Sequence, residues 1–318
     1  MKLITTISAA VIGGTALFAG TSFMAHKALL DREFDTPQAL KDVFYKRSKK
    51  PVLREADERE VWFNSQEFKE YVIENAAGKK IKGYFLPSAT PSDIYVLCCP
   101  GYKAGAKKEF RFISKFYHDT GINLFLIDHQ AAGESEGKYI SFGVKEYPDA
   151  LQWLHFMNTT FGNDIKIILH GVSMGAATVN LMCGDASLPD NVIFAVSDCS
   201  FTSPYELFKH SLKNAHWPVY PLLTGIDITN RLTQGFSFED CHTPIEAVKY
   251  SHTPTLFIHG KRDNFVPWHM TEELYESSSA EDKELYLIDN ASHCACYLKE
   301  PLEYTKRILK FIEKYGRP

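Results

Sequence analysis

Apolar residues along this chain fall into short continuous runs, separated by longer segments in which they recur every three or four positions. Three of the runs, Ile94 to Cys99, Ile122 to Ile127 and Ile165 to Leu169, are apolar at almost every position. This pattern is typical of strands that are buried on both faces of a parallel sheet. Further apolar runs occupy residues 192–196, 255–258 and 285–288.

Helical spacing of the apolar residues separates several of these runs. It covers Lys107 to Asp119, Val144 to Phe161 and Pro301 to Tyr315. Nearer the amino terminus, residues 68–74 and 80–87 flank Ala77-Gly78 and predict a hairpin. Strands that alternate with helices predict an α/β fold with a mostly parallel central sheet flanked by helices.

One stretch, His216 to Glu246, interrupts this alternation. It is apolar but has no strand periodicity, so we interpret it as a small cap insertion, about residues 215–247, over the ends of the strands. Four of its side chains are the predicted substrate-pocket residues: Trp217, Tyr220, Leu222 and Leu223.

The amino-terminal stretch from Leu3 to Ala25 contains no charged residue. As a helix it would extend about 35 Å, enough to cross a bilayer, so we predict an N-terminal membrane helix. The alternatives are a cleaved signal peptide, whose apolar part is about 7–15 residues long, and a helix packed within a soluble protein. The predicted organisation is an anchor or signal segment over 1–30, a spacer over 31–64 and a catalytic domain over 65–318.

The side of the membrane depends on two conflicting signals. The short N-terminal flank favours translocation, so we expect a catalytic domain that is extracytoplasmic and anchored by a single helix, or secreted after signal cleavage. Unpaired cysteines favour a reducing compartment instead.

Composition excludes several classes of protein. Of the 318 residues, 45% are hydrophobic and 23% are charged, values near the averages of globular domains. This excludes a disordered chain, a collagen-like chain and a multi-span membrane protein. The formal net charge is -4, and no basic surface is evident, so nucleic acid is not an expected partner.

The seven cysteines are an odd number and cannot all pair within one chain. Cys98 and Cys99 lie in a predicted strand, and we interpret them as small buried packing residues. Cys294 and Cys296 form a C-x-C that lacks the second ligand pair of a zinc site. We therefore expect reduced cysteines and no metal site.

The segment Gly171-Val172-Ser173-Met174-Gly175 follows a predicted strand and precedes a helical run. A G-x-S-x-G between strand and helix is the pattern of a nucleophile elbow, a tight turn that exposes the serine hydroxyl above the sheet. The glycines leave the room that such a turn needs. Ser173 is therefore the predicted nucleophile.

A serine hydroxyl needs a base, and the base needs a carboxylate that orients it. His293 follows the last predicted strand, where a loop can bring its imidazole to the serine. Asp263 follows the strand over residues 255–258, and Asp198 follows the strand over 192–196, so both are candidates for the carboxylate. The order Ser173, Asp263, His293 favours Asp263.

Acyl transfer also needs hydrogen-bond donors for the developing oxyanion. One predicted donor is the backbone N–H of Met174, directly after the nucleophile. The other is the backbone N–H of Tyr102, because Gly101 lets the chain approach the site after the strand Ile94 to Cys99.

These motifs together resemble the α/β-hydrolase superfamily, and more narrowly the bacterial membrane-anchored prolyl-oligopeptidase-like hydrolases that have no propeller domain. The resemblance covers about Glu67 to Tyr315. It rests on Pro100-Gly101-Tyr102, on DHQAAGESEG from Asp128, on GVSMGAAT from Gly171, on SDCSFTSPYELF from Ser197 and on FIHGKRDNFVP from Phe257. The family implies Ser173 as nucleophile, Asp263 and His293 as its partners, and no cofactor.

Two motifs depart from the family pattern. Pro100 stands where members commonly have His, and Gln130 and Ala132 replace the Arg and His of the segment after the next strand. Neither departure involves Ser173, Asp263 or His293. We therefore expect a serine hydrolase that cleaves carboxylic esters through an acyl-enzyme, acting on a small-molecule ester or a short peptide. The alternatives are an amide or peptide hydrolase and a catalytically silent binding module.

Overall fold

The computed structural model describes residues 18–36 and 57–316 and divides into two compact units. The larger unit contains residues 57–202 and 242–316. The smaller unit contains residues 18–36 and 203–241. The predicted site residues from Tyr102 to Ser173 and from Asp263 to His293 belong to the larger unit.

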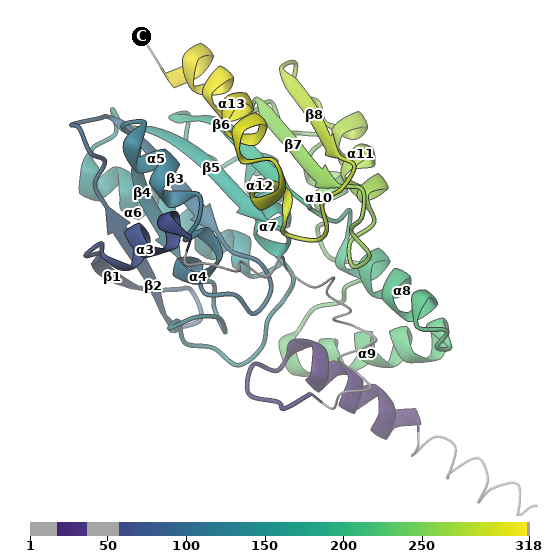
Figure 1. Ribbon diagram of the computed structural model, residues 1–318. Helices are drawn as coiled ribbons and strands as arrows, with labels where there is room; N and C mark the ends of the chain where they lie inside the picture. Colours follow the sequence, from purple (N-terminus) through teal and green to yellow (C-terminus); the bar gives the residue numbers. More distant parts are fainter. Residues whose placement is uncertain (1–17, 37–56, 317–318) are drawn as a thin grey trace, which may run out of the picture. The chain divides into compact units, whose positions relative to one another are not determined.

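An eight-stranded sheet forms the centre of the larger unit, with the strand order β1-β2-β4-β3-β5-β6-β7-β8 (Figure 1). Only β2 runs antiparallel to its neighbours β1 and β4, whereas the other adjacent pairs are parallel. The α/β class and the mostly parallel sheet predicted from the sequence are confirmed. The strands are β1 (Lys69–Glu74), β2 (Lys80–Leu86), β3 (Ile94–Cys99), β4 (Asn123–Ile127), β5 (Lys166–Val172), β6 (Val192–Asp198), β7 (Thr255–Gly260) and β8 (Lys283–Ile288).

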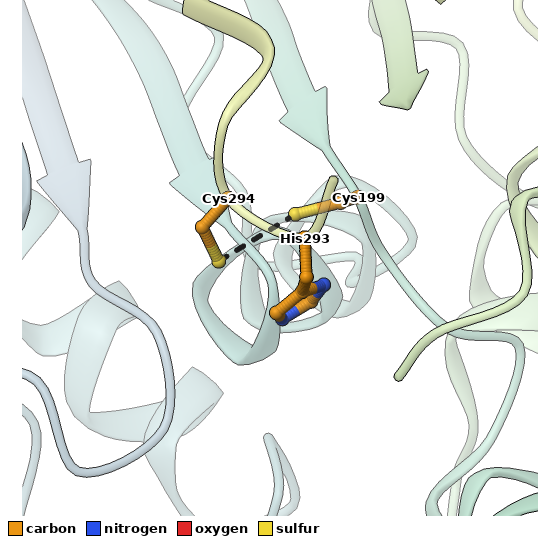
Figure 2. Close-up of side chains that lie close together, drawn as sticks. All are labelled: Cys199, His293 and Cys294. Atoms are coloured by element: carbon orange, nitrogen blue, oxygen red, sulfur yellow. Dashed lines mark hydrogen bonds between the residues drawn. The ribbon is translucent and has the colours of Figure 1, made fainter. Parts of the chain in front are cut away.

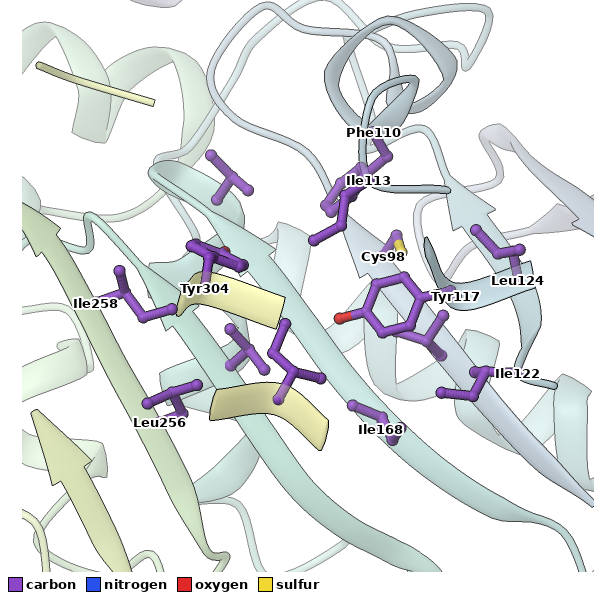
Figure 3. Packing of buried hydrophobic residues seen from close by; sticks show 14 of the residues in the cluster. Cys98, Phe110, Ile113, Tyr117, Ile122, Leu124, Ile168, Leu256, Ile258 and Tyr304 are labelled. Carbon is purple, nitrogen blue, oxygen red and sulfur yellow. The ribbon is translucent and has the colours of Figure 1, made fainter. Parts of the chain in front are cut away.

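Both faces of the parallel strands are buried, which explains their continuous apolar sequences. Successive side chains of a strand point to opposite faces, so Val96 and Cys98 of β3 join one buried cluster while Leu97 joins the other. The first cluster, seen in Figure 3, also contains Phe110, Tyr117 and Tyr304. The second contains Trp153 of α6 (Glu146–Phe161) and Val179 of α7 (Met174–Cys183).

The other helices of the larger unit are α3 (Glu58–Asn64), α4 (Ala106–Phe110), α5 (Ser114–Asp119), α10 (Pro244–Ala247), α11 (Trp268–Ser277), α12 (Cys296–Lys299) and α13 (Pro301–Phe311), with a π-helical turn η1 (Ile312–Gly316).

The segment from Lys107 to Asp119 forms two short helices, α4 and α5, so the single helix predicted there is wrong. Phe110, Phe112 and Ile113 are all buried. Residues this close in sequence cannot all point to one side of a regular helix. The turn between α4 and α5 brings all three side chains into the core.

Residues 58–64, which the sequence analysis assigned to the spacer, form α3. At the start of this helix, the side chain of Asp57 accepts a hydrogen bond from the backbone N–H of Arg59. Phe63 is buried, and the rings of Trp62 and His118 lie 4.9 Å apart. The larger unit therefore includes this helix as a packed element.

The smaller unit contains a helix over residues 18–30, α8 (Pro204–Asn214) and α9 (Val219–Gln234). Helix 18–30 packs on α9 through small and polar side chains. A Cβ on Gly225 would overlap Ser22, and His26 Nε2 lies 3.0 Å from Thr233 Oγ1. Burial is the main reason that the pKa of His26 falls to about 4.

This packing does not support the predicted N-terminal membrane helix. None of the helices within residues 18–36 and 57–316 is both long and apolar enough to cross a bilayer. The end of the predicted span, from Phe18 to Ala25, begins a helix whose buried face includes Ser22 and His26. The remainder of the predicted segment, residues 1–17, lies outside the described residues.

Asp149 of α6 gives the larger unit a predicted dependence on pH. Its buried carboxyl accepts a hydrogen bond from Asn75 (2.9 Å), and burial raises its pKa from 3.8 to about 6. The folded state therefore binds the proton more tightly than the unfolded chain does. The neutral carboxyl of Asp149 therefore stabilises the folded state most at a pH below 3.8, the pKa in the unfolded chain. This stabilisation is lost as the pH rises through about 6, the pKa in the folded state.

We therefore expect Asp149→Asn to be more stable than the unsubstituted protein at neutral pH, by about 2–3 kcal/mol. The two proteins should have similar stability near about pH 2.5, well below the unfolded pKa of 3.8, where the carboxyl is neutral in both states. Urea denaturation at both pH values measures the difference, with the exposed Asp164→Asn as control. A gain of stability that is equal at both pH values would contradict this assignment.

Candidate functional site

Ser173 occupies a strained turn between β5 and α7. Its backbone has φ 57° and ψ -116°, in the left-handed half of the conformational map that residues other than glycine rarely occupy. A Cβ on Gly171 would overlap the carbonyl of Gly175, and a Cβ on Gly175 would overlap the carbonyl of Cys99. The two glycines of the predicted elbow thus permit the approach of strand, turn and helix that holds Ser173 in place.

His293 lies in the loop after β8 and reaches the serine. Its Nε2 is 2.9 Å from Ser173 Oγ, and both residues are buried. The ring of Phe265 meets the imidazole edge-on, with centroids 5.0 Å apart. The imidazole is therefore held within hydrogen-bond distance of the hydroxyl, as the prediction required.

Asp263 lies on the other side of the imidazole, with its Oδ2 2.5 Å from His293 Nδ1. Its Oδ1 accepts hydrogen bonds from the backbone N–H groups of Phe265 and Val266, both at 2.9 Å. A second imidazole, that of His259 at the end of β7, lies 3.1 Å from Oδ2. The structure therefore brings together Ser173, His293 and Asp263, and their catalytic roles stay predictions.

The competing carboxylate, Asp198, has a different hydrogen-bond partner. Its Oδ2 accepts a hydrogen bond from Tyr304 (3.0 Å), whose hydroxyl also lies 3.0 Å from His170 Nε2. His170 Nδ1 in turn lies 2.8 Å from the hydroxyl of Tyr117. Burial is the main reason that the pKa of Asp198 is raised to about 7.

This polar chain was missed in the sequence analysis, because its members come from β5, β6, α5 and α13. No local motif joins them. His259 was missed for a different reason, although it stands four residues before Asp263 in FIHGKRD. That short spacing at the end of a strand was a usable signal.

Asp263 and His293 shift each other's pKa in opposite directions. Burial would raise the pKa of Asp263, but the charge of His293 and the hydrogen bonds of both histidines lower it below its usual value. Burial likewise would lower the pKa of His293, yet the charge of Asp263 and the neighbouring Cys294 sulfur raise it well above 6.5. An imidazole paired in this way with a carboxylate is stabilised in its protonated form.

The loop after β3 lies against the serine turn, which is where the oxyanion donors are predicted. A Cβ on Gly101 would lie 3.4 Å from the Cβ of Ser173. Met174 is the first residue of α7, whose N-terminus carries partial positive charge. The ring of Tyr102 stacks on Phe142 with centroids 4.9 Å apart. The donor roles of Met174 and Tyr102 stay predictions.

Asp128 links this loop to the next one. Its carboxylate accepts hydrogen bonds from the backbone N–H groups of Ala106 and Glu134 and from the hydroxyl of Tyr84, each at 2.8 Å. It is the first residue of the DHQAAGESEG motif. The side chain thereby connects the start of α4 with the loop after β4, which is a physical reason for an acid at this position.

The four predicted pocket residues belong to the smaller unit. Leu222 and Leu223 are buried, Trp217 is half-buried, and Tyr220 is exposed. Their role as a substrate pocket stays a prediction. Among the described residues, one cluster has the composition of a metal site: Cys199, His293 and Cys294.

Comparison with known proteins gives consistent results. The sequence profile of the prolyl oligopeptidase family matches residues 110–317. The uncharacterized protein YqkD of Bacillus subtilis (strain 168) is 32% identical over 267 residues, which cover 82% of this chain and 86% of YqkD.

Two solved esterase structures are similar in fold. The Pyrococcus furiosus esterase Pf2001 has a TM-score of 0.66 at 22% identity, over 85% of this chain and 99% of that chain. The esterase EaEST from Exiguobacterium antarcticum has a TM-score of 0.55 at 15% identity, over 76% of this chain and 98% of that chain. At such identities the likeness concerns the fold alone, which is the α/β-hydrolase fold.

The two candidate carboxylates can be distinguished by the titration of His293. We expect Asp263→Asn to lower the pKa of His293, because the main interaction opposing burial is removed. Asp198→Asn should change this pKa much less, since Asp198 contacts Tyr304 instead. Imidazole resonances followed by NMR over a pH series measure both effects. An equal or larger shift in Asp198→Asn would contradict the pairing.

Proposed function

Because this chain belongs to the prolyl oligopeptidase family of hydrolases, we propose that it is a serine hydrolase that cleaves carboxylic esters through an acyl-enzyme. The observation that carries the proposal is the continuous contact from Ser173 Oγ to His293 Nε2 (2.9 Å) and from His293 Nδ1 to Asp263 Oδ2 (2.5 Å). In this proposal Ser173 is the nucleophile, His293 the general base and Asp263 the residue that orients the base.

Acylation requires the neutral form of His293, protonated on Nδ1 and hydrogen-bonded to Asp263; because the pKa of this imidazole is raised, the reactive form increases as the pH rises. Its Nε2 accepts the hydroxyl proton as Ser173 Oγ attacks the ester carbonyl carbon. The charge of Asp263 stabilises the imidazolium that forms. His293 then gives the proton to the leaving alcohol, and the acyl group remains on Ser173.

The tetrahedral intermediates carry a negative oxygen that needs donors. We assign this role to the backbone N–H groups of Met174 and Tyr102, which lie on two segments adjacent to Ser173. Deacylation repeats the sequence, with water as the nucleophile and His293 again as the base. In this second step His293 takes a proton from water and returns it to Ser173 Oγ as the acid leaves, so every proton is carried by Ser173, His293, water and the substrate without a cofactor.

Esters are preferred over amides in this proposal because the structural neighbours named above are esterases. The family name favours a second candidate, hydrolysis of amides or short peptides on the same three residues. Fold does not decide between these substrates. A matched ester and amide with the same acyl group, compared by kcat/KM, separates the two.

The first prediction concerns the three residues as a unit. Ser173→Ala and His293→Ala should each lower kcat for ester hydrolysis on the order of a thousandfold or more, while the fold remains intact. Because both residues act in one step, the double variant should lose little more than either single variant. Steady-state kinetics with circular dichroism as a check on folding measures this. If the fold-loss of kcat in the double variant equalled the product of the two single losses, the shared role of the two residues would be contradicted.

The second prediction concerns the pocket side chains of the smaller unit. Tyr220 is 67% exposed, so Tyr220→Ala removes little packing. If its ring contacts the acyl chain, the variant should lose kcat/KM for an octanoyl ester but not for an acetyl ester. The selective loss should reach about tenfold, which corresponds to roughly two buried methylene groups.

Leu223→Ala is the matched control, because Leu223 is 1% exposed. Its truncation should cost about 2–5 kcal/mol of stability and reduce activity on every ester alike. Thermal midpoints recorded beside the kinetics separate the two cases. A uniform loss in Tyr220→Ala would exclude its pocket role.

A further inference from the structure

Two cysteine sulfurs face each other beside the imidazole of His293 (Figure 2). Cys199 directly follows β6, and Cys294 directly follows His293 in the loop after β8. The two Sγ atoms are 3.8 Å apart. Each of the three side chains has a ligand atom within 4.8 Å of the others. Residues from two distant parts of the chain thus place two sulfurs and one nitrogen around a common point.

The spacing of the sulfurs matches a tetrahedral metal centre. Zinc–thiolate bonds are about 2.3 Å long, so two thiolates on one tetrahedral zinc ion lie about 3.8 Å apart. A cation can therefore bind both sulfurs without a change in their separation. A disulfide would require the sulfurs to approach to about 2.05 Å. The contact is the hydrogen bond that the Cys199 thiol donates to Cys294 Sγ, so a cation would take the place of the two thiol protons while the sulfurs keep this separation.

The ligand set also selects the kind of cation. Thiolate and imidazole ligands favour Zn²⁺ and similar soft divalent ions over Mg²⁺ and Ca²⁺, which prefer oxygen. Cys199, His293 and Cys294 provide three ligands and leave a fourth position for water. This set was not evident in the sequence, where Cys294 was considered only with Cys296.

A cation has a route to the cluster. Cys294 is half-buried, and its side chain lines a small cavity of about 40 Å³ together with Val172 and Asp198. The volume is enough for one or two water molecules. All seven cysteines lie within the described residues and none of them forms a disulfide; five are buried, namely Cys98, Cys99, Cys183, Cys199 and Cys296.

Binding of a cation would interfere with catalysis because both imidazole nitrogens already have partners. Nε2 faces Ser173 and Nδ1 faces Asp263. A metal on either nitrogen therefore replaces one of these hydrogen bonds. Loss of the first removes the base from the serine, and loss of the second removes the group that orients the base.

We propose that Cys199, His293 and Cys294 form an inhibitory binding site for a thiophilic divalent cation of the Zn²⁺ type. The inhibitory part of the inference rests on the proposed function, in which His293 is the general base. The binding part stands on the cluster itself. A zinc ion bound here replaces the hydrogen bond of one His293 nitrogen, to Ser173 or to Asp263, and its removal restores the resting arrangement.

The binding test uses Co²⁺, which takes zinc sites and reports sulfur ligands through a charge-transfer absorption. The full-length protein is kept reduced with a phosphine, which competes for metal less than thiol reductants do. We expect the sulfur-to-cobalt absorption to saturate at one ion per chain and to be displaced by Zn²⁺. Cys199→Ser and Cys294→Ser should each lower the affinity more than about tenfold, because even loss of a supporting outer-shell group costs about that much.

Cys241→Ser is the matched control. Cys241 is also half-buried, but it lies in the smaller unit, where its sulfur donates to the carbonyl of Phe238. This variant should bind Co²⁺ as the unsubstituted protein does. His293→Ala should keep the sulfur absorption but bind more weakly, with altered visible bands that show the loss of a nitrogen ligand.

The activity test compares ester hydrolysis with and without Zn²⁺ in each protein. Zn²⁺ should inhibit the unsubstituted protein, and a chelator should reverse the inhibition. In Cys199→Ser, the rate of ester hydrolysis with Zn²⁺ at the same concentration should be close to the rate without Zn²⁺. Absence of the sulfur absorption, its persistence in both cysteine variants, or binding without inhibition of an active enzyme would each overturn the proposal. If no ester is hydrolysed at all, the proposed function fails, and the Co²⁺ titration still decides whether the site binds metal.

Discussion

The strained turn at Ser173 is the constraint on which the arrangement of the site depends. Ser173 keeps a positive φ only because Gly171 and Gly175 allow β5, the turn and α7 to approach without side chains between them. The same approach places the start of α7 against the backbone of Cys99 at the end of β3. Hydroxyl, helix terminus and neighbouring loop therefore share one rigid support, the carboxyl edge of the parallel sheet.

Two buried acids at neighbouring strand ends show how the surroundings determine a role. Asp263 receives two backbone N–H groups and contacts two imidazoles, and its pKa is held below the usual range. Asp198 contacts a tyrosine hydroxyl instead, and burial raises its pKa to about 7. The first environment stabilises a negative charge beside His293. The second favours a neutral carboxyl, which could not stabilise an imidazolium as well.

Local patterns predicted most of this fold because the signals of β3, β5 and the serine turn each lie within a few residues. The positions of Ser173, Asp263 and His293 followed from strand ends and chain order, and the family resemblance agrees with the profile match. The break between α4 and α5 could not be seen, because it depends on burial of Phe112. The contact of Cys199 with Cys294 spans 95 residues, so only the folded chain reveals it. The apolar composition of the amino terminus suggested a membrane span, whereas the face of Ser22 and His26 that packs on α9 depends on tertiary contacts.

Labelling by a fluorophosphonate tests the central claim most directly, because the probe reacts with a serine that a neighbouring base activates. The account predicts one adduct per chain, located by peptide mass spectrometry on the segment that contains Ser173. Labelling should be lost in Ser173→Ala and strongly slowed in His293→Ala, while Asp198→Asn should still react. No adduct on the folded protein, or an adduct that persists in Ser173→Ala, would contradict the account and favour a binding role for this fold.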